Sequence, residues 1–265
     1  MSDDKRVWLV TGASSGFGRA IAEAATAAGD LVVGTSRRPS GDEVRLDLTE
    51  AGAAERAVAE VEQRYGRVDV LVNNAGHGQV GAAEETTDAE LREIFEVHVF
   101  GPAALVRAVL PGMRARRRGA IVQMSSFGGQ VALPGFSAYC ATKFALEGYS
   151  EALAAEVRPH GVKVLVVEPG AFRTRLFGGG LVQSKTLDAY ADTVGPTRAM
   201  IEAGDGAQPG DPAKAASAIL AALDADVTPL RLPLGGDAVD GIVGHLDGVR
   251  AEINTWESTS RATAF

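Results

Sequence analysis

The stretch TGASSGFG, residues 11–18, decides the fold expected for this chain. An apolar, strand-like run precedes it and a helix-like stretch follows it. Gly12, Gly16 and Gly18 let the backbone turn tightly and approach a pyrophosphate, and the helix N-terminus offers free N–H groups to the phosphates. Their spacing, GxxxGxG, differs from the GxGxxG of the commoner dinucleotide fingerprint. The stretch therefore predicts a dinucleotide-binding turn; a glycine turn that serves packing alone is the alternative.

Apolar runs alternate with helix-like stretches along most of the 265-residue chain. The runs are continuous and rich in Val and Leu, which is typical of parallel strands covered on both faces. Such a succession predicts an α/β fold with a doubly wound parallel sheet of the Rossmann type, in a single domain. We expect strands at residues 7–10, 31–35, 44–46, 68–72, 120–124, 162–167 and 229–234, and helices at 17–28, 51–65, 88–116, 137–157 and 212–225.

The character of the chain changes after Pro169. Residues 172–212 contain three consecutive glycines and only short apolar pieces, and we expect a mobile substrate flap with one or two short helices there. The tail after Gly235 is polar and weakly helical. No linker or repeat marks a second domain.

Composition excludes several classes of function. The hydrophobic share of 46% with 23% charged residues is that of a soluble globular protein, and the net charge of −8 disfavours nucleic acids and anionic membranes as partners. No apolar run approaches the ~20 residues of a membrane span, and the scattered histidines predict no metal site. The single cysteine, Cys140, forms no intramolecular disulfide; we expect it to be buried, in a cytoplasmic protein.

Cofactor choice is encoded where the second strand ends. Proteins that bind NAD usually carry an acidic residue there for the ribose 2′-hydroxyl, whereas this chain reads Thr35-Ser36-Arg37-Arg38. Arginine binds a 2′-phosphate well and no carboxylate repels it. The sequence therefore predicts NADP(H), with solvated surface arginines as the alternative.

Tyr139 and Lys143 lie at i and i+4 of a predicted helix and share one face of it. A phenol with a pKa of ~10 is a poor base at neutral pH, but a nearby ammonium group lowers that pKa. The tyrosine can then exchange a proton with a carbinol oxygen. An ordinary surface pair is the alternative.

These motifs, together with Asp47-Leu48, Asn73-Asn74-Ala75-Gly76, Ser126 and the run at residues 169–174, occur in a fixed order over residues 6–174. In this the chain resembles the short-chain dehydrogenases/reductases of the single-domain type. The run at residues 139–148 is similar to the branch that contains 17β-hydroxysteroid and retinol dehydrogenases. The resemblance implies that Tyr139 is the acid/base, that Ser126 rather than Ser125 binds the reacting oxygen, and that Lys143 holds the nicotinamide ribose.

The resemblance and the motifs together imply a set of cofactor-binding residues: Gly12, Ser14, Ser15, Gly16, Phe17, Gly18, Ser36, Arg37, Arg38, Asp47, Leu48, Asn74, Ala75, Gly76, Tyr139, Lys143, Pro169, Gly170, Phe172 and Thr174.

His98 stands where the family usually has an asparagine in the middle of its long helix. In the family this position supports a relay water, largely through its backbone carbonyl. We include His98 among the candidate catalytic residues. Its side chain can preserve the relay, shift its pH response or break it; a packed core histidine is the alternative.

The sequence thus predicts an NADP(H)-dependent oxidoreductase that moves hydride between the nicotinamide and a ketone or secondary alcohol. The alternative is an NADP(H)-binding regulator with little turnover. The expected substrate is a small hydrophobic carbonyl compound, and the family resemblance implies a homodimer or homotetramer formed by the two long helices, although the unusual tail argues against the tetramer. Candidates to line an apolar substrate pocket are Phe127, Leu133, Phe136, Phe172, Leu176 and Phe177.

Overall fold

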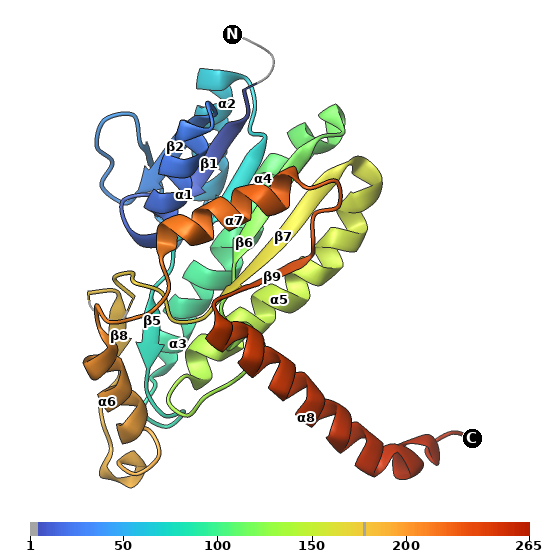
Figure 1. Ribbon diagram of the computed structural model, residues 1–265. Helices are drawn as coiled ribbons and strands as arrows, with labels where there is room; N and C mark the ends of the chain where they lie inside the picture. The colour runs from blue at the N-terminus through green and yellow to red at the C-terminus, as the bar shows by residue number, and fades with distance from the viewer. Residues whose placement is uncertain (1–4, 177–178) are drawn as a thin grey trace.

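The computed structural model describes residues 5–176 and 179–265, and its centre is one parallel sheet (Figure 1). All strand pairs in this sheet are parallel. The predicted doubly wound α/β fold is confirmed. In spatial order the strands are β3 (Val44–Arg45), β2 (Leu31–Ser36), β1 (Val7–Thr11), β4 (Val70–Asn73), β6 (Gly119–Met124), β7 (Val162–Pro169) and β9 (Arg231–Leu234).

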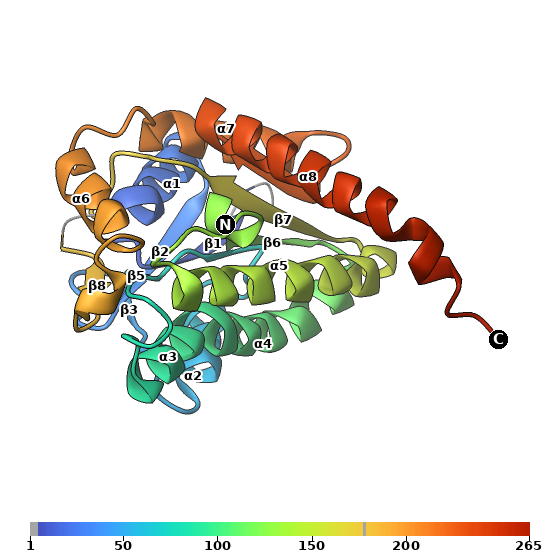
Figure 2. The same ribbon diagram turned by 90° about the horizontal axis from the view of Figure 1, so that it is seen from below.

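Helices cover both faces of the sheet (Figure 2). The strands are buried on both sides because successive side chains point to opposite faces. The helices beside the sheet are α1 (Gly16–Ala27), α2 (Ala53–Tyr65), α3 (Asp88–Phe95), α4 (Gly101–Arg116), α5 (Ser137–Val157) and α7 (Pro212–Asp224). Leu9 of β1 packs in the core under α2, α4 and α5, and its neighbour Val10 packs in the core under α1 and α7.

The helix expected at residues 88–116 contains a π-helical turn, η1 (Glu96–Phe100), between α3 and α4. The whole segment is long and apolar enough to cross a membrane by length and composition alone, which corrects the expectation that no stretch approaches such a span. It is a core element here, because Leu105, Val106 and Val109 pack against the sheet.

The predicted flap region forms a small subdomain beside the sheet. β5 (Gly78–Val80) pairs in parallel with β8 (Leu181–Gln183), and a 3-10 turn η4 (Asp188–Tyr190) leads into α6 (Gly195–Gly204). Phe177 and Gly178 of the predicted flap lie outside the described residues.

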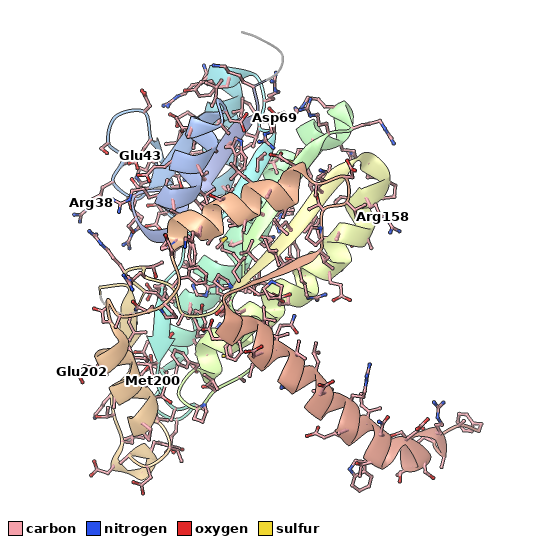
Figure 3. The ribbon with its side chains drawn as sticks, viewed as in Figure 1. Arg38, Glu43, Asp69, Arg158, Met200 and Glu202 are labelled. Atoms are coloured by element: carbon pink, nitrogen blue, oxygen red, sulfur yellow. The ribbon has the colours of Figure 1, made fainter. Side chains whose placement is uncertain are left out.

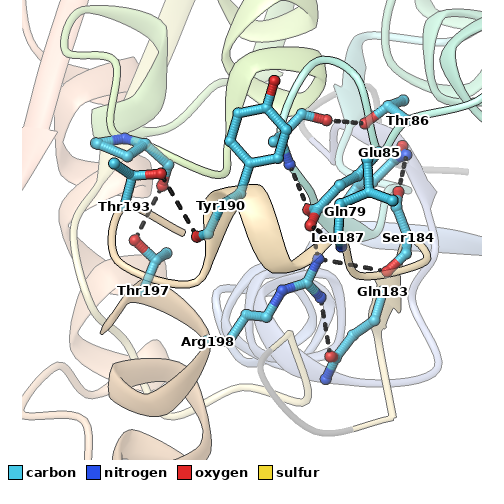
Figure 4. A network of polar contacts seen from close by, with 12 residues as sticks. Gln79, Glu85, Thr86, Gln183, Ser184, Leu187, Tyr190, Thr193, Thr197 and Arg198 are labelled. Atoms are coloured by element: carbon cyan, nitrogen blue, oxygen red, sulfur yellow. Dashed lines mark hydrogen bonds and ion pairs between the residues drawn. The ribbon is translucent and has the colours of Figure 1, made fainter. Parts of the chain in front are cut away.

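A buried ion pair fastens this subdomain to the body (Figure 4). The Glu85 carboxylate accepts hydrogen bonds from the backbone N–H of Ala82 and of Leu187, each at 2.8 Å, and from Nη2 of Arg198 at 2.9 Å. Arg198 also donates to Oε1 of Gln183 at 3.2 Å. These bonds lower the pKa of Glu85, the backbone bonds contributing most. The region that the sequence predicts to be a mobile flap is therefore held by hydrogen bonds to Glu85.

The tail, expected to be weakly helical, is a 26-residue helix, α8 (Gly236–Arg261). It leaves the end of β9 and extends away from the body in both views (Figures 1 and 2). Ala238 and Ile242 in its first turns are buried, and residues 243–261 are exposed.

Candidate active site

A cavity of about 490 Å³ opens at the carboxyl ends of β1, β2, β4, β6 and β7. It lies where the order of strands reverses beside β1, which is the usual place for a ligand in an open α/β sheet. The cavity brings together residues far apart in the sequence. Of the residues predicted from sequence, its wall contains Gly12, Ser14, Ser15, Gly16, Phe17, Ser36, Arg37, Asp47, Leu48, Asn74, Ala75, Gly76, His98, Ser126, Tyr139, Lys143, Pro169, Gly170, Phe172 and Thr174.

Two predicted cofactor contacts, Gly18 and Arg38, lie outside this wall as described. A Cβ on Gly18 would come within 2.4 Å of both the Gly12 carbonyl oxygen and Nδ2 of Asn74. Gly18 therefore permits close packing beneath the turn. Arg38 points outward from the loop after β2, as Figure 3 shows.

The glycine turn has the geometry of an anion site. Gly12 and Gly16 adopt positive φ, +66° and +54°, which favours glycine. Ser15 is the N-cap of α1, and within the described chain its side chain makes no capping bond. The first N–H groups of α1 thus face the cavity and remain available for a phosphate. This arrangement fits the pyrophosphate of a dinucleotide.

Thr11 and Asn74 hold the turn in place, and sequence reasoning assigned neither of them this role. The Thr11 hydroxyl accepts hydrogen bonds at 2.9 Å from the backbone N–H of Asn74 and of Ala75. Nδ2 of Asn74 donates at 2.8 Å to the Thr11 carbonyl oxygen. These bonds tie the ends of β1 and β4 together. The signal in the sequence was a hydroxyl residue at the end of the first strand.

At the end of β2 the structure adds an acidic residue that the sequence motif does not include. Ser36 donates to Oε2 of Glu43 at 3.0 Å, and the backbone N–H of Ser40 donates to the same oxygen at 2.9 Å. Glu43 lies outside the cavity wall as described, whereas Arg37 lines it. Arg37 also helps to lower the pKa of Asp47, after the larger effect of the Asp47–Thr49 hydrogen bonds.

Ser126 and Tyr139 face each other in the cavity. Ser126 Oγ accepts the backbone N–H of Gly128 at 3.0 Å, which leaves its proton free for donation. Burial raises the pKa of Tyr139 to about 12, and the hydrogen bond with Ser126 opposes this rise. The expectation that Lys143 would lower this pKa is therefore wrong for the protein alone, since burial dominates.

Lys143 is buried next to Tyr139. Its Nζ donates to the carbonyl oxygen of Met124 at 2.9 Å and lies 5.7 Å from the centroid of the Tyr139 ring. Burial lowers the pKa of Lys143 to about 8, and the negative charge of Glu147, one turn further along α5, opposes that change. Near neutral pH the phenol is protonated and Lys143 is mostly charged.

His98 is a buried residue of η1, and its hydrogen bonds indicate its tautomer. The Thr142 hydroxyl donates to the Tyr139 carbonyl oxygen at 2.7 Å, so at its 2.9 Å contact with Nδ1 of His98 it must accept. Nε2 of His98 accepts the backbone N–H of His77 at 3.2 Å. Both contacts suit the neutral Nδ1–H tautomer, and burial holds the pKa of His98 well below its usual range.

The apolar wall is smaller than predicted. Phe172 and Leu176 line the cavity, and half-buried His77 and exposed Glu93 join them. Phe136 packs beside Tyr139, with ring centroids 6.0 Å apart, and Phe127 sits against Gly241 of α8. Leu133 is exposed. Among the residues that the structure describes, no cluster of ligands suits a metal ion.

Comparison with known proteins agrees with this geometry. A family model described as short chain dehydrogenase matches residues 6–180. The crystal structure of a short-chain dehydrogenase from Streptomyces avermitilis is 60% identical, covers 100% of both chains and has a TM-score of 0.93. Oxidoreductase BOA17 of Botryotinia fuckeliana is 35% identical over 98% of this chain and 99% of its own.

A metagenomic short-chain oxidoreductase solved in complex with NADP is 35% identical, with a TM-score of 0.59 over 63% of this chain and 83% of its own. The matched family region contains the glycine turn and the Ser126, Tyr139 and Lys143 side chains that meet in the cavity. The chain therefore belongs to the short-chain dehydrogenase/reductase family.

Proposed function

We propose that this oxidoreductase interconverts a ketone and a secondary alcohol with NADP(H) as its cofactor. The observation that carries the proposal is the convergence of Ser126, Tyr139 and Lys143 on the same cavity as the glycine turn. Ser126, Tyr139 and Lys143 would therefore share their cavity with a dinucleotide held by that turn. The nicotinamide supplies or accepts the hydride.

Ser126 and Tyr139 are suited to bind one carbonyl oxygen between them. The Ser126 hydroxyl is held by the Gly128 N–H and can donate its proton to that oxygen. Tyr139 then transfers its phenolic proton as the oxygen gains charge. Because the pKa of Tyr139 is about 12, the residue carries its proton at neutral pH and is ready for reduction. Lys143 is placed to stabilise the phenolate that remains.

The preference for NADP(H) rests on Arg37. Arg37 lines the cavity at the end of β2, and Glu43, an acidic residue of the loop that follows, lies outside the cavity wall and accepts hydrogen bonds from Ser36 and Ser40. A 2′-phosphate there would meet the cation of Arg37, while the Asp47 carboxylate in the same wall accepts hydrogen bonds from Thr49. The relative bound to NADP supports the same choice.

The substrate that we propose is a small hydrophobic carbonyl compound in a cytoplasmic setting. Val97 and Leu176 add apolar surface to the cavity wall, and His77 and Glu93 add polar groups to it. This surface favours a compound with one polar end.

The test has two stages. Binding of NADPH and NADH is measured by calorimetry, and cofactor oxidation is then followed over aliphatic, aromatic and steroid ketones. We expect tight NADPH binding and turnover with some of these ketones. Binding of NADPH without turnover across the panel would favour the regulator instead. A protein that binds neither cofactor would overturn the proposal.

A further inference from the structure

The exposed part of α8 carries a narrow apolar stripe. Its six side chains recur at intervals of three and four residues along the helix, and each is 38% to 63% exposed. They are Val239, Val243, Leu246, Val249, Ile253 and Trp256. Val239, Leu246 and Ile253 are seven residues apart, as are Val249 and Trp256, which is the repeat of a helix that packs against another helix. The stripe continues with Val243 on the same side.

This helix is poorly suited to stand alone in water. Residues 243–261 are exposed, whereas helices in proteins gain most of their stability from packing an apolar face against other elements. Gly244, Gly248 and several β-branched residues disfavour helix further. Within the described chain, its one ion pair between successive turns is Arg261–Glu257. Packing of the stripe against a partner would supply the missing stabilisation.

The charges of α8 limit what that partner can be. The helix has five acidic residues against two arginines, so an anionic membrane would repel it. The acidic residues are Asp237, Asp240, Asp247, Glu252 and Glu257. The stripe is narrow, which fits a single helix better than a broad surface.

We propose that the partner is the α8 helix of a second copy of this chain, packed antiparallel on the stripe. The stripe is complementary to itself when reversed. With Leu246 opposite the partner's Val249, Ile253 approaches the partner's Val243 and Trp256 approaches the partner's Val239. A two-fold axis then relates the copies, with the two bodies at opposite ends of the helix pair.

Charge distribution selects this direction. In the antiparallel register, His245 lies near the partner's Glu252 and Arg250 near the partner's Asp247, and the two-fold axis repeats both pairs. In the same register Glu257 lies near the partner's Asp240, and this contact between like charges opposes the pairing. A parallel pair would instead place Glu252 beside the partner's Glu257, a like-charge contact, and Arg250 beside the partner's His245 rather than an acidic residue.

The test measures oligomeric state by analytical ultracentrifugation on the full chain. Leu246→Glu places a charge in the stripe, and Ser258→Glu places the same charge on the opposite side of the same helix. We expect the unmodified protein and Ser258→Glu to be dimers. We expect Leu246→Glu to raise the dimer dissociation constant at least ~30-fold, with the thermal unfolding of the body unchanged because these positions are exposed.

Engineered disulfides test the direction. The double variant His245→Cys with Glu252→Cys should form a cross-linked dimer under oxidation, because these positions meet only in the antiparallel pair. Ile253→Cys should not, since the two copies of that position are then far apart. A protein that is monomeric at all concentrations, a dimer that survives Leu246→Glu, or efficient cross-linking through Ile253→Cys would each overturn the proposal.

Discussion

Nδ1 of His98 lies 2.9 Å from the hydroxyl of Thr142, and this contact joins the π-helical turn η1 to the helix that carries Tyr139 and Lys143. The other ring nitrogen of His98 accepts the backbone N–H of His77, in the segment after β4. One imidazole therefore links two walls of the cavity. Its ring also meets that of Tyr139 edge-on, with centroids 5.7 Å apart. The side chain acts as a buried, neutral link that positions Tyr139.

The first prediction follows from the depressed pKa of His98. A side chain that stays neutral cannot add an inflection between pH ~6 and ~7.5 to the rate of reduction. We expect the profiles of kcat against pH for the unmodified protein and His98→Asn to share the same shape in that range under saturating NADPH. An inflection there that disappears in His98→Asn would show that the imidazole titrates during turnover.

The same histidine should make stability depend on pH. Its folded pKa lies below its unfolded value, so its contribution is complete above pH ~6.5 and is lost as the pH falls, by at most about 1.4 kcal/mol per pH unit. His98→Leu should lose this dependence, and should also cost about 1–3 kcal/mol near neutral pH because the His77 N–H loses its acceptor. Urea unfolding at several pH values checks both effects, with His160→Gln as the matched control. Equal pH dependence in all three proteins would contradict this prediction.

Removal of the Tyr139 hydroxyl should abolish most turnover. Tyr139→Phe keeps the ring between His98 and Phe136, so we expect packing and NADPH affinity to be nearly unchanged. The loss of a general acid should lower kcat at least ~100-fold. Tyr149→Phe, a half-buried tyrosine on the same helix, is the control and should be fully active. Turnover close to the original in Tyr139→Phe would exclude this hydroxyl from the reaction.

Arg37 and Arg38 offer a matched pair for cofactor choice, because one lines the cavity and the other points outward. A charge-assisted bond to a 2′-phosphate contributes about 1.5–3 kcal/mol, so kcat/KM should favour NADPH over NADH by at least ~10-fold. Arg37→Asp should erase or reverse this preference, and Arg38→Asp should leave most of it. Steady-state kinetics with both cofactors decides. Equal effects of the two substitutions would mean that a place in the cavity wall does not decide cofactor choice.

Glu85 should control how firmly the α6 subdomain is held. Its side chain is 2% exposed and binds two backbone N–H groups as well as Arg198. Glu85→Gln weakens these charge-assisted bonds, and we expect a loss of about 1–3 kcal/mol in unfolding free energy, with faster proteolysis of residues 181–204. Because the folded pKa of Glu85 is lowered, its contribution is present above its unfolded pKa and is lost as the pH falls through the folded value.

The control for Glu85 is its neighbour. Glu84→Gln changes an exposed carboxylate that accepts a hydrogen bond from the Tyr190 hydroxyl, and it should alter neither stability nor proteolysis measurably. If the two glutamine variants behave alike, the buried ion pair does not hold the subdomain.

The sequence alone determined the sheet and the order of the motifs along it. A continuous apolar run such as the one in β1 indicates a strand that is buried on both faces, and every residue of β1 is buried. The glycine turn was equally readable, since the positive φ of Gly12 and Gly16 is a local property of the backbone. Tyr139 and Lys143 share a helix face by spacing alone.

Only the tertiary structure decided the features that depend on partners distant in the chain. The bond between Thr11 and Asn74 spans 63 residues, and that between His98 and Thr142 spans 44. The exclusion of Arg38 from the cavity and the elevated pKa of Tyr139 come from the surroundings that the fold provides. The sequence predicts a polar, weakly helical tail, yet it forms α8, whose six exposed apolar side chains become a stripe only once the helix brings them to one side. Desolvation, hydrogen-bond partners and shared faces are properties of the packed chain, which is why residue identity and spacing could not predict them.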